Sequence, residues 1–70
     1  MTLYEAETGV EYVISGIDVD DDELTSFLFT LGCYSGEKIT VVSRKKNNLV
    51  LAIKDGRYNI DPELARAIKV

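Results

Sequence analysis

Apolar side chains in the second quarter of the chain recur at i, i+3, i+4 and i+7, the spacing of one helix face: Leu24, Phe27, Leu28 and Leu31. This pattern predicts an α-helix from Asp21 to Leu31. Asp20, with Glu23 three residues later, has the spacing of a capping box and predicts the N-cap, where carboxylates also interact favourably with the helix dipole. Gly32 can adopt the left-handed conformation that ends a helix.

Short segments rich in β-branched and aromatic residues, separated by turn residues, predict strands in the rest of the chain. The expected strands are residues 11–17, 38–44, 49–54 and 57–60, with 68–70 as a closing strand. Gly16 indicates a bend in the first of them. The polar residues 45–48 and the Asp55-Gly56 pair predict the two hairpin turns.

Apolar residues occupy both faces of the strand expected at 49–54, with Leu49, Leu51 and Ile53 on one face and Val50 and Ala52 on the other. Such a strand is covered on both sides and central in its sheet. Asp61 before Pro62 predicts a short helical turn that runs to Ala67. The expected fold is therefore mainly β: a small, partly closed antiparallel barrel with one inserted α-helix and a short helical turn before the last strand. It forms a single domain over residues 1–70.

The residue counts exclude several kinds of chemistry. The 70 residues include one cysteine and no histidine. One cysteine cannot form an internal disulfide, and the missing histidine removes the commonest general base and transition-metal ligand. We therefore expect a cytoplasmic protein that is not an enzyme and holds no cofactor.

Charge and hydropathy argue against two classes of partner. The chain has 8 basic and 12 acidic residues, and its net charge of −4 repels a phosphate backbone. No apolar run approaches the about 20 residues that span a bilayer. Glu5 and Glu7 stand where a signal peptide would be apolar or basic. We expect no nucleic-acid binding and no direct membrane insertion.

The acidic run from Asp18 to Glu23 is the first candidate for a metal site. Aligned with an EF-hand calcium loop, it has Glu23 where the turn glycine belongs and Phe29 where the bidentate glutamate belongs. Two interpretations stay open. The run is either a solvated helix start or a weak, labile divalent-cation site with Asp20 and Asp22 as candidate ligands.

Cys33 is the only thiol, and a structural zinc site needs several soft ligands. A free cysteine is commonly buried, so packing behind Gly32 is one interpretation. The other is a metal site that Cys33 completes together with a second copy of the chain or with a partner.

The basic cluster Arg44-Lys45-Lys46 has no aromatic residue within it. It is interpreted as a solvated hairpin tip, with a docking point for an acidic partner or for headgroups as the alternative.

Phe29 lies well away from the apolar stripe of the predicted helix, since each residue advances about 100° around the axis. Its side chain is either covered by the barrel or exposed. An exposed aromatic residue near a second one, here Tyr34, is a common anchor of protein interfaces. Phe29 and Tyr34, with Cys33 beside them, are therefore the candidate partner-binding residues.

The order of these motifs resembles the FeoA family of small bacterial ferrous iron transport proteins. The resemblance covers essentially the whole chain and rests on Leu3, Gly9, Gly16-Ile17, Phe27-Leu28-Phe29-Thr30-Leu31-Gly32, Gly36, Ile39, Val41, Ile60, Glu63, Ala65, Ile68 and Val70. It implies an SH3-like barrel, similar to the carboxy-terminal domain of metal-dependent repressors of the diphtheria-toxin type.

The resemblance also implies a function. We expect a non-enzymatic accessory protein that modulates ferrous iron uptake by contacting the membrane permease FeoB, whose cytosolic part binds GTP. The alternative is a metal-responsive oligomer in which Cys33 and carboxylates from two copies share an ion.

Overall fold

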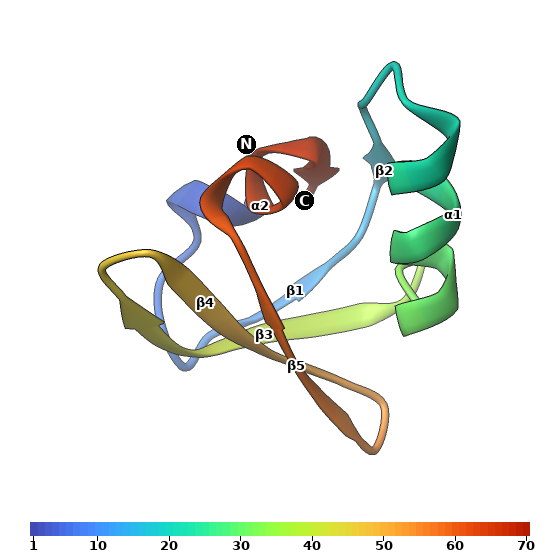
Figure 1. Ribbon diagram of the computed structural model, residues 1–70. Coiled ribbons are helices and arrows are strands. Elements are labelled where there is room, and N and C mark those ends of the chain that lie inside the picture. Colours follow the sequence, from blue (N-terminus) through green and yellow to red (C-terminus); the bar gives the residue numbers. More distant parts are fainter.

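Two antiparallel sheets make up most of the structure, a computed structural model that describes residues 1–70 (Figure 1). One sheet has four strands in the order β1-β3-β4-β5, and the other pairs β2 with β6. The elements in chain order are η1 (Leu3–Glu5), β1 (Glu11–Val13), β2 (Gly16–Ile17), α1 (Asp22–Leu31), β3 (Lys38–Lys45), β4 (Asn48–Ile53), β5 (Gly56–Ile60), α2 (Pro62–Ala67) and β6 (Ile68–Lys69). The expected mainly β fold with one inserted helix is confirmed.

The single strand predicted over residues 11–17 is wrong, because the chain forms two strands in different sheets there. β1 pairs with β3, whereas β2 pairs with β6. Between the two strands lies the buried Ile14, which still bonds to the segment directly before β3. Its N–H donates to Glu37 O at 2.9 Å, and its carbonyl accepts from Gly36 N at 2.7 Å. The bend therefore precedes Gly16 and carries the chain from one sheet to the other.

β4 is an interior strand of the four-stranded sheet, as predicted. Its residues alternate between buried side chains at Leu49, Leu51 and Ile53 and half-buried side chains at Asn48, Val50 and Ala52. The pairing of β3 with β4 shifts register between Val41 and Ser43. This bulge explains why apolar and polar residues alternate imperfectly in β3.

The first hairpin turn is tighter than predicted, and the second lies one residue earlier than the predicted Asp55-Gly56. Only Lys46 and Asn47 connect β3 to β4, and Lys54 and Asp55 connect β4 to β5. Lys54 has a φ of 54°, so a lysine takes the left-handed position of the second turn. Gly56 instead begins β5, where a Cβ atom would collide with the Tyr58 ring and hydroxyl.

The first and last segments of the chain pack against each other and close the barrel. The Asp61 side chain caps α2 by accepting from Leu64 N at 2.9 Å, as predicted. β6 follows α2 directly and pairs with β2. α2 also packs against η1, and Val70 N donates to Met1 O at 3.0 Å. Figure 1 accordingly shows the amino and carboxyl ends beside each other next to α2.

The core is purely apolar, with no buried polar or charged residue. Most of its members come from η1, β3, β4, α2 and β6, whereas α1 contributes only Leu28. Its members are Leu3, Ala6, Ile14, Leu28, Cys33, Ile39, Val41, Leu49, Leu51, Ile53, Ile60, Leu64, Ala65, Ala67 and Ile68.

Candidate protein-interaction surfaces

The helix α1 and its N-cap each lie one residue later in the sequence than predicted. Asp21, not Asp20, is the N-cap, and its Oδ1 accepts from Glu23 N at 2.9 Å and from Leu24 N at 3.3 Å. The Asp20 prediction is wrong because a cap must have extended backbone directly before the first helical turn, and Asp21 occupies that position. Asp20 is left outside the helix.

The apolar stripe of α1 is only partly buried. Leu28 is fully buried, and Leu31 is half-buried against the core. Leu24 and Phe27 retain 36% and 45% of their surface exposed. The helix therefore rests on the barrel mainly through Leu28 and presents apolar side chains on either side of that contact.

Phe29 and Tyr34, here called the aromatic pair, stack on the side of α1 away from its stripe. Their ring centroids are 5.2 Å apart and their planes differ by 12°. The left-handed Gly32 reverses the chain after α1, which brings Tyr34 back beside Phe29. The two rings remain 40% and 48% exposed, and the Lys54 ammonium lies 5.9 Å from the Tyr34 ring centroid. Tyr34 thus covers one part of the Phe29 side chain, and another part stays exposed to solvent.

Cys33 does not share this exposure. Its side chain is fully buried, and burial raises the pKa of its thiol to about 11. A buried, protonated thiol is neither a surface contact nor a ready metal ligand. The structure therefore separates Cys33 from the aromatic pair with which the sequence had grouped it.

Within one chain, Cys33 lies far from the other two predicted metal ligands, Asp20 and Asp22. Asp20 and Asp22 lie at the start of α1 and Cys33 lies beyond its end, so a helix of 10 residues, about 15 Å long, separates them. No group of three or more cysteine, aspartate or glutamate residues is arranged to hold a metal ion.

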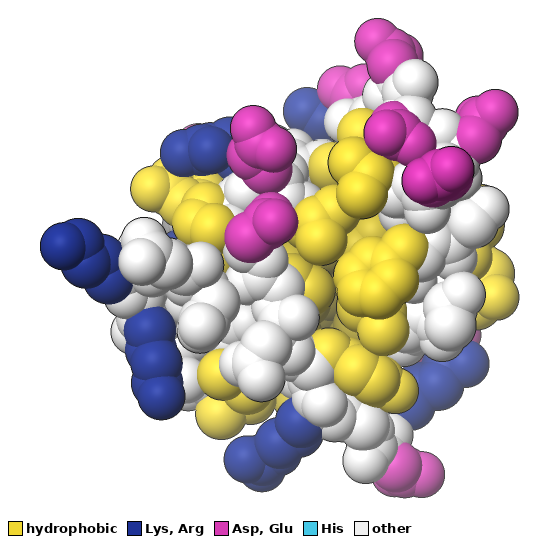
Figure 2. Space-filling model, viewed as in Figure 1, with side chains coloured by type: hydrophobic (Ala, Val, Ile, Leu, Met, Phe, Trp, Pro, Cys, Tyr) yellow, Lys and Arg dark blue, Asp and Glu magenta, His cyan; other side chains and the backbone are white.

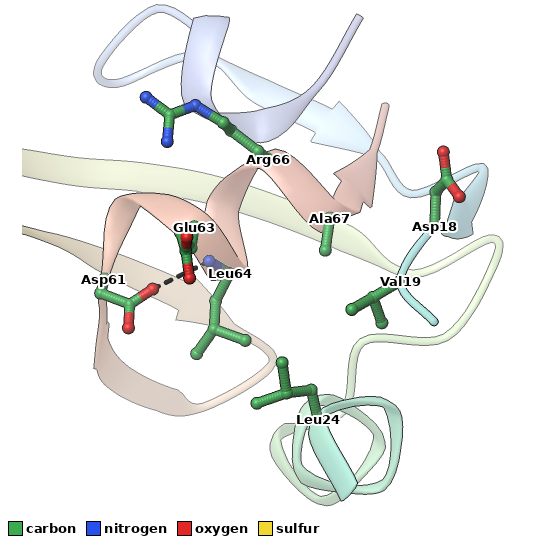
Figure 3. A pocket seen from close by; sticks show the side chains of 8 residues that line it. All are labelled: Asp18, Val19, Leu24, Asp61, Glu63, Leu64, Arg66 and Ala67. Carbon is green, nitrogen blue, oxygen red and sulfur yellow. Dashed lines mark hydrogen bonds between the residues drawn. The ribbon is translucent and has the colours of Figure 1, made fainter. Parts of the chain in front are cut away.

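A groove between α1 and α2, which the sequence did not indicate, is the second exposed apolar surface (Figure 3). It has a volume of about 350 Å³ and a floor formed by Val19, Leu24, Leu64 and Ala67. Its edges carry Asp18, Asp61, Glu63 and Arg66. The side chains of Leu24 and Leu64 point toward one another across it. Val19, an apolar residue inside the acidic run, was the one local signal of this groove.

The basic hairpin tip divides into two parts. The Arg44 guanidinium donates to Ala6 O and lies 5.7 Å from the Tyr4 ring centroid, so this residue ties β3 to the start of the chain. Lys45 and Lys46 are exposed and make no ion pair.

None of the helices has the length and apolar character needed to cross a membrane.

Comparison with known proteins identifies the fold and its relatives. A family model, the FeoA domain, matches residues 1–70. The FeoA of Stenotrophomonas maltophilia in complex with zinc, described as a prokaryotic SH3 domain protein, is 20% identical with a TM-score of 0.87. The match covers 97% of this chain and 86% of that one.

Two further solved structures have the same fold. An iron uptake regulatory protein, FeoA, is 19% identical with a TM-score of 0.86, over 97% of this chain and 91% of that one. A manganese-dependent transcriptional repressor is 17% identical with a TM-score of 0.88, over 97% of this chain but 39% of the repressor. No curated protein matches the sequence. The SH3-like fold is thereby shown.

Proposed function

Because this chain belongs to the FeoA family, which is associated with iron uptake, we propose that it is a cytoplasmic, non-enzymatic accessory protein. Its partner is the cytosolic GTP-binding part of a FeoB-type ferrous iron permease. The observation that carries the proposal is the aromatic pair, which is ordered by stacking and yet about half exposed.

The aromatic pair has the properties of an interface anchor. Aromatic side chains bury large areas on binding and lose little conformational entropy, particularly when stacking already restricts them. The Lys54 ammonium beside the Tyr34 ring adds a charged group at the rim, where it is held by Glu37 at 3.6 Å. An apolar centre with a polar rim is the usual arrangement of a protein interface.

The residue chemistry supports binding over catalysis. The chain has no histidine, and its one thiol is buried with a raised pKa. Exposed carboxylates and lysines would then have to carry out any reaction. Lys38, Lys54 and Lys69 form ion pairs at the surface with carboxylates.

The test is a calorimetric titration of the native chain against the cytosolic part of the permease. Phe29→Ala should weaken binding by about thirtyfold or more, because an interface aromatic contributes about 2 kcal/mol or more. Phe27→Ala is the matched control, since Phe27 lies on the same helix with a similar exposed fraction of 45% but outside the aromatic pair. It should leave the affinity nearly unchanged.

Two results would contradict the proposal: no heat of binding for the native chain, or equal losses for Phe29→Ala and Phe27→Ala. Unchanged amide spectra of both variants would establish that each keeps its fold.

A metal-responsive oligomer is the second candidate, favoured by the zinc complex of the S. maltophilia FeoA. In this chain the exposed Asp20 and Asp22 would have to meet donors from another copy, because Cys33 is buried. Sedimentation with and without zinc or ferrous ions decides the matter, and an unchanged monomer excludes this candidate.

A further inference from the structure

We propose that the groove between α1 and α2 binds a segment of a partner protein whose apolar side chains are flanked by lysine or arginine. This surface is separate from the aromatic pair, and the proposal does not depend on the permease being the partner. It rests on an apolar floor, a mainly acidic rim and the orientation of the one lining cation, Arg66, away from the floor.

The floor is apolar and open. Val19, Leu24, Leu64 and Ala67 come from three separate segments, namely the loop before α1, α1 itself and α2. Leu24 keeps 36% of its surface exposed and Val19 is half-buried, whereas Leu64 and Ala67 are buried beneath them. A volume of about 350 Å³ is near the lower end of the range of about 300 to 1,000 Å³ for binding pockets. It accommodates aliphatic side chains from one face of a peptide.

Acidic side chains border this floor on both sides. Figure 2 shows hydrophobic surface between α1 and α2 with acidic groups at the start of α1 and others beside α2. Glu63 on the rim forms no ion pair, and neither do Asp20, Asp22 and Glu23, which lie near the groove in sequence but do not line it. The rim therefore attracts basic groups, and the attraction is reduced by salt.

The two cations near the groove do not neutralise its rim. Arg66 directs its guanidinium away from the floor (Figure 3). Its Cζ atom lies 4.2 Å from the ring centroid of Tyr4. Lys69 pairs with Asp18 at 3.6 Å, but both side chains are well exposed, so the pair is weak. An incoming lysine or arginine can therefore pair with Glu63 without displacing a buried partner.

The charge pattern also disfavours the other occupants of such a surface. Anionic lipid headgroups would meet the carboxylates of the rim, which repel them. In a second copy of this chain, the exposed basic tip Lys45-Lys46 is followed by Asn47 and Asn48 and has no apolar side chain to place on the floor. The net charge of −4 further opposes association between copies.

The experiment is a nuclear magnetic resonance titration of the isotope-labelled full chain with a synthetic amphipathic helical peptide made of leucine and lysine. The expected result is a set of shifted amides around Val19, Leu24, Leu64 and Ala67, with affinity that falls as salt is added. A peptide with glutamate in place of every lysine is the control and should not bind.

Two variants separate the floor from the rim. Leu24→Ser should weaken peptide binding by about tenfold through lost apolar burial, and Glu63→Gln should weaken it by about two- to fivefold at low salt. Phe29→Ala should bind the peptide like the native chain. Leu24 and Glu63 are both surface residues, and Asp61 is left intact because it caps α2.

Several outcomes would overturn the proposal. They are shifts confined to residues outside the groove, equal binding of the glutamate peptide, no loss with Leu24→Ser, or amide shifts that depend on chain concentration without peptide, which would make the groove a contact between copies. None of these depends on the permease, so this proposal and the one for the aromatic pair can fail separately.

Discussion

Cys33 lies at the turn after α1, where its backbone N–H donates to Leu28 O at 3.0 Å while its thiol is enclosed by the core. The sequence left two roles open for it, packing and ligation. The burial of its side chain favours packing, because exposure and a lowered pKa are what make a thiol reactive.

The raised pKa of Cys33 predicts a loss of stability in alkali. The folded thiol has a pKa of about 11, against a reference value of 9.0 for an exposed one. The folded state therefore holds a proton that the unfolded state releases, and stability is full below pH 9 and falls as the pH approaches 11. The expected loss is about 2 kcal/mol.

The measurement is urea unfolding at several pH values for the native chain and Cys33→Ala. All other side chains are the same in the two proteins, so the difference between their pH profiles reports the thiol. Parallel profiles between pH 9 and pH 11 would show that Cys33 is not protected in the folded state.

Phe29 shows what residue-level inference from the sequence can and cannot achieve. Its angular position around the helix is a local property, so its separation from the apolar stripe was predictable. Its stacking on Tyr34 depends on the reversal of the chain at Gly32, and the groove depends on where α2 comes to lie. Leu64 and Leu24 line the same groove only once the chain has folded.

At the scale of elements, α1 is only lightly supported by tertiary packing, because Leu28 is its one fully buried residue. Its local interactions then matter more than usual, since short helices are marginal without packing. Asp21 provides the most direct of these by satisfying two backbone donors of the first turn.

Replacing the cap should therefore destabilise the chain measurably. Asp21→Ala should lower the free energy of unfolding by about 1 kcal/mol. Asp20→Ala is the matched control, since it removes a carboxylate of the same run that caps nothing, and its effect should be within about 0.5 kcal/mol. Chemical denaturation of both variants measures the difference, and a larger loss for Asp20→Ala would contradict the observed cap.

The elements that were predicted correctly are those set by neighbouring residues. The helical stripe, the alternation in β4 and the Asp61-Pro62 helix start all operate within a few positions. The division of residues 11–17 into β1 and β2 is different, because β2 finds its partner in β6 at the other end of the chain. No local pattern distinguishes one strand that bends from two that separate.

At the scale of the whole molecule, closure depends on the last residues of the chain. β6 pairs with β2, its Ile68 is fully buried, and Lys69 forms a bridge with Thr2. A domain of this size has a stability of only about 4 to 10 kcal/mol. The loss of one buried isoleucine and of one strand pairing would remove a large part of this stability.

Removing residues 68–70 should therefore abolish cooperative unfolding, which thermal melts followed by circular dichroism would detect. Lys69→Ala is the control and should cost less than about 1 kcal/mol, because only an exposed ion pair is lost. A truncated chain that melts cooperatively at the native midpoint would show that β6 is dispensable.

The hydrogen bond from Val70 N to Met1 O places the two ends of the polypeptide side by side. A short glycine linker could join them, and a new opening could be cut at the exposed Lys46-Asn47 turn. In such a circular permutant only the linker, η1 and β1 would separate β6 from β2, whereas β3 and β4, which a two-residue turn now joins, would lie at opposite ends of the chain. The extensive pairing of β3 with β4 would become distant in sequence, so contact order should rise and folding should become slower while the native contacts stay the same.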